Sequence, residues 1–156
     1  MSGESFESGS GIVATYSTFL ERYVQIGFAS NRAISVQFPI VYDDPDIDHS
    51  LLDRISDYLA GVDEDFTDVP IALTVSSDHR AVLETVRTIP YGTGVDTETL
   101  ARMTPQLDEA DEDQRIVRTA LDGNPLPLLI PDHRVRDAPG GAPPVVEQRL
   151  RSLERL

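Results

Sequence analysis

Three residue types are missing from this chain of 156 residues: cysteine, lysine and tryptophan. Without cysteine the chain can form neither a disulfide bond nor a thiolate metal site, and it has no cysteine nucleophile. The longest apolar run, around residues 128–130, is far too short to cross a membrane. The first ten residues have no basic start and no apolar stretch, so we expect no secretion signal and a cytoplasmic protein.

Positive charge is scarce. All 13 basic residues are arginines, 27 residues are acidic, and the formal net charge is −14 at pH 7. An acidic surface without lysine keeps a protein hydrated in concentrated salt, so the composition predicts a halophilic cell. The whole-molecule charge argues against nucleic acid and anionic membranes as partners. However, residues 1–113 carry 6 arginines and 22 acidic residues, whereas residues 114–156 carry 7 and 5. The objection to nucleic acid therefore weakens for the C-terminal part.

The N-terminal half reads as a small α/β unit over residues 11–75, after a frayed tail at residues 1–10. Alternating apolar residues predict three strands, and a turn signal between the last two predicts a hairpin. These strands are expected at residues 11–16, 23–29 and 33–38. Helical spacing of apolar residues then predicts a helix with Ser50 as N-cap and Gly61 as its stop. A short strand is expected at Pro70–Val75.

The C-terminal half, residues 76–156, reads as mostly helical. Caps and apolar spacing predict four helices, of which the second is short. They are expected from the cap Ser77 to about Ile89, after the cap Asp96, from about Asp111 to Leu121, and from Pro144 onward. A short helix, a turn and a helix with Arg115 and Arg118 on its outer face form a helix-turn-helix pattern. Two packed helices are common, so this pattern alone is a weak signal for DNA binding.

No metal site is expected. The residues His49, His79 and His133 have no ligand spacing. Alternate carboxylates at residues 44–48 resemble a calcium loop, but the glycine and the closing glutamate that such a loop needs are absent. We therefore interpret this segment as a solvated acidic loop.

One segment places Asn124, Asp132, His133 and Arg134 around an apolar stretch, which reads as a strand or a loop. Asp132 beside His133 would suit an acid–base pair. A structural contact of these side chains with each other or with an arginine is the alternative.

Four motifs in order resemble the 6-O-alkylguanine-DNA alkyltransferases over about residues 76–156. They are Ile89-Pro90-Tyr91-Gly92, the helix-turn-helix, Gly123-Asn124-Pro125 and Pro131-Asp132-His133-Arg134-Val135. The last motif is Pro-Cys-His-Arg-Val in that family. The resemblance implies an RNase H-like α/β N-terminal unit followed by a mostly helical, winged helix-turn-helix-like domain.

The resemblance also implies roles for single residues. In the family an arginine enters the base stack, the lesion base flips into a pocket, and a thiolate takes its alkyl group. Carried over, Arg115 is the inserted residue, with Arg118, Gln114 and Thr97 also at the DNA. At the active-site positions, Asn124 orients the turn and Asp132 takes the place of the nucleophile. His133 takes the place of the proton-relay histidine, and Glu154 that of the residue that orients it. Pro131 and Val135 line the base pocket.

The departures from the family pattern concern the chemistry. Asp132 stands where the family has cysteine, and a carboxylate is a hard, weak nucleophile toward alkyl carbon. Thr97 replaces a tyrosine that helps to rotate the base, and Arg118 and Thr119 replace two small glycines. The segment from Val135 to Pro144 is shorter than the family's loop over the pocket, which predicts a largely absent lid.

Together these features predict a non-catalytic member, similar to the alkyltransferase-like branch of the family. It would bind double-stranded DNA with alkylated guanine as a monomer, without cofactor or membrane, and signal to excision-repair proteins. Two alternatives stay open. One is an enzyme that transfers alkyl groups through Asp132 and His133. The other is an interaction or structural module that has lost its DNA function.

Overall fold

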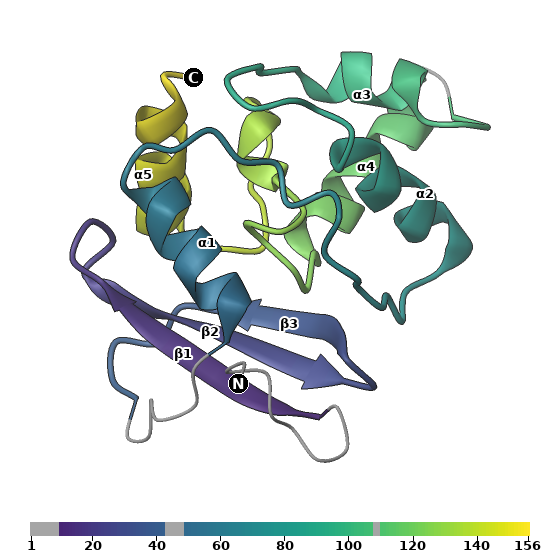
Figure 1. Ribbon diagram of the computed structural model, residues 1–156. Coiled ribbons are helices and arrows are strands. Elements are labelled where there is room, and N and C mark those ends of the chain that lie inside the picture. The colour runs from purple at the N-terminus through teal and green to yellow at the C-terminus, as the bar shows by residue number, and fades with distance from the viewer. Residues whose placement is uncertain (1–9, 43–48, 108–109) are drawn as a thin grey trace.

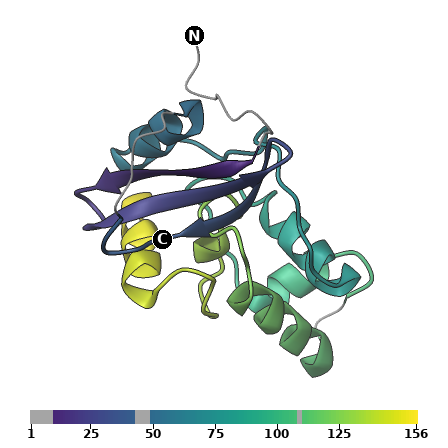
Figure 2. The ribbon, with the colours of Figure 1, turned by 90° about the horizontal axis from the view of Figure 1, so that it is seen from below.

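A three-stranded antiparallel sheet forms one outer layer of the protein (Figure 1 and Figure 2). The computed structural model describes residues 10–42, 49–107 and 110–156. The strands are β1 (Gly11–Ser17), β2 (Arg22–Ala29) and β3 (Arg32–Gln37), in the order β1-β2-β3. Ser30 and Asn31 join β2 to β3 with φ values of 52° and 62°, as a two-residue hairpin turn requires. All three strands and the hairpin are confirmed.

Helix α1 (Ser50–Leu59) follows the sheet in sequence and packs against β1 (Figure 1). Its buried face consists of Leu51, Leu52, Ile55, Tyr58 and Leu59, as the apolar spacing predicted. The N-cap is His49 and not Ser50, because His49 Nδ1 accepts the hydrogen bond of the Leu51 amide at 3.1 Å. Gly61, with φ +107°, follows the helix end as expected.

The strand expected at Pro70–Val75 is wrong. This segment forms only an isolated parallel bridge between Ala33 and Ile71. The Ala33 amide donates to Pro70 O at 2.9 Å, and the Ala72 amide donates to Ala33 O at 3.0 Å. Proline has no amide hydrogen to contribute to a longer ladder, which limits pairing here.

The C-terminal half is mostly helical, as predicted. Its elements are α2 (Ser77–Val86), α3 (Thr97–Met103), α4 (Asp111–Asp122), the 3₁₀ helix η1 (Asp132–Arg134) and α5 (Pro144–Glu154). Asp96 caps α3 as expected, with the Thr99 amide 2.7 Å from its carboxylate. The cap of α2 is Ser76 and not Ser77, and α2 ends at Val86, three residues earlier than expected.

Helix α1 packs against β1, whereas helices α2, α3 and α4 pack on one another. Helices α2, α3 and α4 form a group to one side of the sheet, while α5 lies beside α1 (Figure 1 and Figure 2). A bond of 2.9 Å from the Val36 amide to Pro125 O ties β3 to the segment before η1. One apolar cluster runs through both halves, so the segment around η1 crosses the centre of the molecule.

Some expectations fall on parts of the chain that the structure does not describe. The tail at residues 1–9 and the acidic loop at 43–48 are outside the described residues. The domain boundary between 75 and 76 stays a prediction. No helix in the described part of the chain is long and apolar enough to span a membrane.

Candidate active site and DNA-binding face

The segment that carries Asp132 and His133 is buried along its whole length. Every residue from 131 to 135 is buried, and an apolar run at 126–130 leads into it. Asn124 shapes this turn: its Oδ1 accepts from the Leu126 amide at 2.9 Å, and its Nδ2 donates to Ile130 O at 3.2 Å. The structure thus places Asn124 where it orients the active-site-like turn.

Asp132 is closed in by hydrogen-bond donors. Its Oδ2 accepts from Asn124 Nδ2 at 2.8 Å and from the Gly141 amide at 2.7 Å. Only 1% of the residue is exposed. Burial raises the pKa of Asp132 to about 7, although both hydrogen bonds work in the opposite direction. Near neutral pH, Asp132 therefore exists as a mixture of carboxylate and carboxylic acid.

A glycine pair packs directly on Asp132. A Cβ added at Gly140 would collide with the Asp132 carboxyl group, and one added at Gly141 would collide with Asn124 O. The Gly140 amide donates to Glu147 Oε2 of α5 at 2.6 Å. Two successive amides of this loop are thus held by two acidic side chains. The expectation that the lid is largely absent is wrong, because this short loop covers Asp132.

His133 faces a different environment, at the junction of α1 and α5. Its Nε2 lies 2.7 Å from Glu154 Oε2, as the resemblance implied, and 3.2 Å from the hydroxyl of Tyr58. The Tyr58 hydroxyl also bonds to Glu154 Oε2. Because a carboxylate only accepts, both Tyr58 O–H and His133 Nε2–H donate to Glu154.

The other ring nitrogen of His133, Nδ1, is buried and forms no hydrogen bond within the described residues. Burial lowers the pKa of His133, although Glu154 acts in the opposite direction. At neutral pH the imidazole is therefore neutral, with a free lone pair on Nδ1.

Arg134 completes the network around Glu154. Its Nε donates to Glu154 Oε1 at 2.8 Å, and the two side chains are 2% and 0% exposed. Arg134 Nη1 also reaches Asp65 and Ile89 O, both at 2.7 Å. The Gly92 amide adds a bond of 3.0 Å to Glu154. Burial acts to raise the pKa of Glu154, but hydrogen bonds from His133 and Arg134 outweigh it and lower this pKa to about 2.

Helix α4 carries three of the four residues expected at the DNA, and the fourth, Thr97, begins α3. Arg115 is exposed and has no hydrogen-bond or ion-pair partner among the described residues. Arg118 is also exposed, but it donates to Asp137 O at 2.9 Å and to Thr97 Oγ1 at 3.3 Å. The amide of buried Thr97 donates to Asp137 at 2.8 Å. Gln114 is half-buried. Among these, Arg115 is the side chain most available to a partner.

Four residues of the site were not singled out from the sequence for a role in it. They are Tyr58, Gly140, Gly141 and Glu147. The run of charged residues at 132–134 after an apolar stretch is a usable signal, because charges on a buried segment need partners. The loop glycines show no such signal, since only the tertiary positions of Asp132 and Asn124 leave no room for a side chain there.

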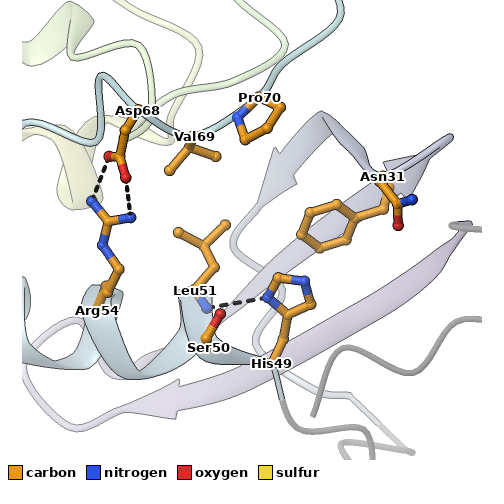
Figure 3. Close-up of a pocket in the computed structure, with 9 residues that line it drawn as sticks. Asn31, His49, Ser50, Leu51, Arg54, Asp68, Val69 and Pro70 are labelled. Carbon is orange, nitrogen blue, oxygen red and sulfur yellow. Dashed lines mark hydrogen bonds and ion pairs between the residues drawn. The ribbon is translucent and has the colours of Figure 1, made fainter. Parts of the chain in front are cut away.

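No group of three metal-ligating side chains occurs within the described ranges. His49 caps α1 and stacks on Phe28, with ring centroids 4.6 Å apart. These two residues line a pocket of about 310 Å³, whose far wall is Asp68 with its ion pair to Arg54 (Figure 3). Its lining residue His49 directly follows residues 43–48 in the sequence, which lie outside the described part of the chain, so we assign the pocket no ligand.

The protein thus combines an α/β N-terminal part with a helical C-terminal part that holds a buried polar site. Residues 77–154 match the DNA-binding domain of 6-O-methylguanine DNA methyltransferase. A methylated-DNA–protein-cysteine methyltransferase of Methanopyrus kandleri is 38% identical over 108 residues, covering 68% of this chain and 78% of that protein. The chain therefore belongs to the 6-O-methylguanine DNA methyltransferase family.

Further relatives extend the comparison. A DNA base-flipping protein of Thermus thermophilus is 38% identical over 89 residues, covering 56% of each chain. The crystal structure of the Mycobacterium tuberculosis O6-methylguanine methyltransferase has a TM-score of 0.71 at 20% identity, covering 94% of this chain and 91% of that one. The same enzyme in complex with DNA has a TM-score of 0.70 at 20% identity, covering 93% and 91%. This structural likeness establishes a shared fold.

Proposed function

We propose that this protein is a non-catalytic, alkyltransferase-like protein that binds DNA containing alkylated guanine and removes no alkyl group. The observation that carries the proposal is Asp132 at the nucleophile position, with its Oδ2 accepting two hydrogen bonds. A carboxylate is already a poor nucleophile toward alkyl carbon, and these bonds reduce its reactivity further. The loop at Gly140 also covers it.

Several observations support DNA binding. Arg115 is exposed on α4, at the position that the family resemblance assigns to the inserted residue. Arg118, Gln114 and Thr97 lie on α4 or at the start of α3, next to it. The family includes DNA-repair enzymes and a DNA base-flipping protein. A protein with these contacts would hold the duplex by its backbone and by stacking at the lesion.

A flipped base would need space beside Asp132. Pro131 and Val135, the proposed pocket walls, are buried, and the glycine loop fills the space over the carboxyl group. Base entry therefore requires the loop at 138–142 to move and to release its bond from the Gly141 amide to Asp132. Lesion binding is then coupled to loop opening, and excision-repair proteins would recognise the occupied state.

The test is fluorescence anisotropy on matched duplexes with and without 6-O-methylguanine, in molar potassium chloride for a halophilic cytoplasm. Counterion release is weak there, so a preference for the lesion reflects stacking and shape. We expect tighter binding to the lesion duplex, binding weakened about tenfold by R115A, and no change in R149A, whose arginine lies on α5. Equal binding to both duplexes would contradict the proposal. Mass spectrometry of the incubated protein should show no added methyl group, whereas a modified Asp132 or repaired DNA would favour the enzyme alternative.

The closed loop favours a second candidate, an interaction module that kept the fold and lost its DNA function. In that case Asp132 is a structural residue, and its two hydrogen bonds serve only to hold the loop. The same anisotropy experiment separates the two proposals. Identical weak binding by wild-type protein and R115A would favour the interaction module.

A further inference from the structure

A second group of arginines lies away from α4, around a hollow of about 480 Å³. Arg32 comes from β3, while Arg80 and Arg87 come from α2 and its C-terminal cap. The segment at residues 67–73 passes between β3 and α2 and, together with Glu84 of α2, completes the wall. Three guanidinium groups from two separate elements thus meet at one depression.

Backbone carbonyls of the intervening segment hold these arginines. Arg32 Nη1 donates to Ile71 O at 3.3 Å, and Arg80 Nη2 donates to Leu73 O at 2.7 Å. Arg87 Nη2 donates to two carbonyls, Phe66 O at 2.9 Å and Val69 O at 2.6 Å. A guanidinium has five N–H donors, so each side chain is fixed in place with several donors unused.

The positive charges of this group are not neutralised by ion pairs. Within the described residues, none of Arg32, Arg80 and Arg87 has a carboxylate oxygen within 4.0 Å. Arg87 is half-buried, its Nε is buried without an acceptor, and burial lowers its pKa. In a chain of net charge −14, three unpaired cations at one hollow form a marked local exception.

Two acidic residues also line the hollow and reduce its net positive charge. Both Asp68 oxygens bond to Arg54, at 2.8 and 3.1 Å, but Arg54 also pairs with Glu64, so Asp68 keeps part of its negative charge and acts on Arg87. Glu84 is exposed on α2, between Arg80 and Arg87 in sequence, and forms no ion pair among the described residues. Glu84 opposes an anion in the hollow without being bonded to any of the three arginines.

We propose that this hollow binds a phosphate group. The guanidinium fork matches the oxygens of phosphate, and charge-assisted hydrogen bonds of this kind are about twice as strong as neutral ones. A bound phosphate would neutralise Arg87 and supply acceptors to the free N–H groups of all three side chains. The phosphate comes either from a small phosphate ester or from a DNA strand that extends beyond α4, against which α2 packs.

The first experiment measures binding of inorganic phosphate to the full-length protein by isothermal titration calorimetry at constant ionic strength. We expect binding that R80A weakens about tenfold or more, which is the effect typical of removing a charged hydrogen-bond donor. E84Q should strengthen it about two- to fivefold, because it removes the opposing charge. R22A is the matched control, since Arg22 also donates to a backbone carbonyl, Phe38 O at 3.0 Å, but lies at the start of β2. It should bind phosphate like the wild type.

The second experiment identifies the source of the phosphate. Anisotropy with an unmodified duplex over a series of salt concentrations gives the slope of the logarithm of the binding constant against the logarithm of the salt concentration. The magnitude of this slope should fall by about one in R80A if the hollow contacts the DNA backbone. An unchanged slope with weakened phosphate binding assigns the hollow to a small phosphate ester. R80A and E84Q that match wild type in both experiments would overturn the proposal. Lesion preference is a separate readout, so the proposed function can fail or succeed independently.

Discussion

Asp132 and Glu154 are both buried carboxyl groups, and their pKa values are shifted in opposite directions. The pKa of Asp132 is raised to about 7, whereas the pKa of Glu154 is lowered to about 2. Glu154 contacts Arg134, His133, Tyr58 and an amide. Asp132 has only neutral donors, from an amide side chain and a backbone amide. Burial alone therefore does not decide the charge state of a buried acid, and the presence of a bonded cation does.

The contrast between the two carboxyl groups separates the retained part of the family's machinery from the altered part. On the Glu154 side, a neutral His133 has a free Nδ1 lone pair, which is the state that a proton relay needs. On the Asp132 side, the proposed function places a carboxyl group at the nucleophile position, and the loop at Gly140 packs against it. In the proposed function, His133 and Glu154 would keep the proton relay that the family resemblance implies, beside a weak nucleophile at Asp132.

The largest expected effect tests that separation directly. Under the proposed function D132C should gain alkyl transfer, because it introduces a thiol beside His133, which Glu154 already holds by a hydrogen bond. After incubation with a duplex containing 6-O-methylguanine, intact mass spectrometry should detect one added methyl group on D132C and none on wild type. D132S is the control, since its hydroxyl is a poorer nucleophile than a thiolate. No methyl group on a D132C protein that still binds the duplex would show that the relay is also inactive.

Removal of the Glu154 carboxylate should reduce the free energy of unfolding more than the other substitutions. E154A leaves Arg134 buried without its main carboxylate, and removal of one partner from a buried pair destabilises a protein by about 3–5 kcal/mol. Urea unfolding at neutral pH measures this loss. R149A is the comparison, because the exposed pair of Arg149 with Glu21 should contribute less than about 1 kcal/mol. Similar losses in E154A and R149A would refute a central role for the Glu154 network.

The pH dependence of stability should distinguish the two carboxyl groups. The folded protein binds a proton on Asp132 up to about pH 7, whereas the unfolded chain loses it near 3.8. The contribution of Asp132 is therefore fully present below about pH 4 and is lost as the pH rises through 7. Glu154 acts in the opposite sense: its contribution is present above 4.5 and is lost as the pH falls toward 2.

D132N isolates the first of these effects. Between about pH 4 and 7, the free energy of unfolding of D132N should rise relative to wild type by up to about 1.4 kcal/mol per pH unit. Parallel urea unfolding series for both proteins give this difference, and the contributions of His133 and Glu154 are common to both. A difference that stays constant across this pH range would mean that Asp132 is ionised throughout.

A smaller effect is expected at the loop. G140A should destabilise the protein by about 1–3 kcal/mol, because the added Cβ has no room beside the Asp132 carboxyl group. The double variant D132A/G140A should lose much less than the sum of its single changes, since removal of the carboxyl group would leave space for the new methyl group. Thermal unfolding of the wild type and the three variants completes this double-mutant cycle. Additive losses would show that the added methyl group does not clash with the Asp132 carboxyl group.

Sequence reasoning predicted the elements better than the contacts. The three strands, α1, the capped start of α3 and α5 follow from local patterns of apolar residues and caps. The pairing of His133 with Glu154 was expected only from the family resemblance, since the two residues lie 21 positions apart in the sequence. The segment at 70–75 was predicted as a strand because its residues favour extended structure, but its partner β3 pairs with it only at Ala33.

Other contacts carried no local signal. Tyr58 occupies an apolar position of α1 and looks like an ordinary core residue, yet its hydroxyl bonds to Glu154 across the molecule. Glu147 lies in the first turn of α5, where an acidic residue is expected in any helix. Its bond to the Gly140 amide depends on how the loop returns toward Asp132. Such contacts are set by tertiary packing, which no local pattern encodes.

The bond between Tyr58 and Glu154 also limits how this chain can be divided or recombined. The family match covers residues 77–154, but the last residue of that match depends on a hydroxyl from α1, and Arg134 depends on Asp65. A fragment that begins at residue 76 would keep every family motif and still lose those two partners. Evolution could therefore exchange the N-terminal half of this protein only for one that supplies an equivalent hydroxyl and carboxylate.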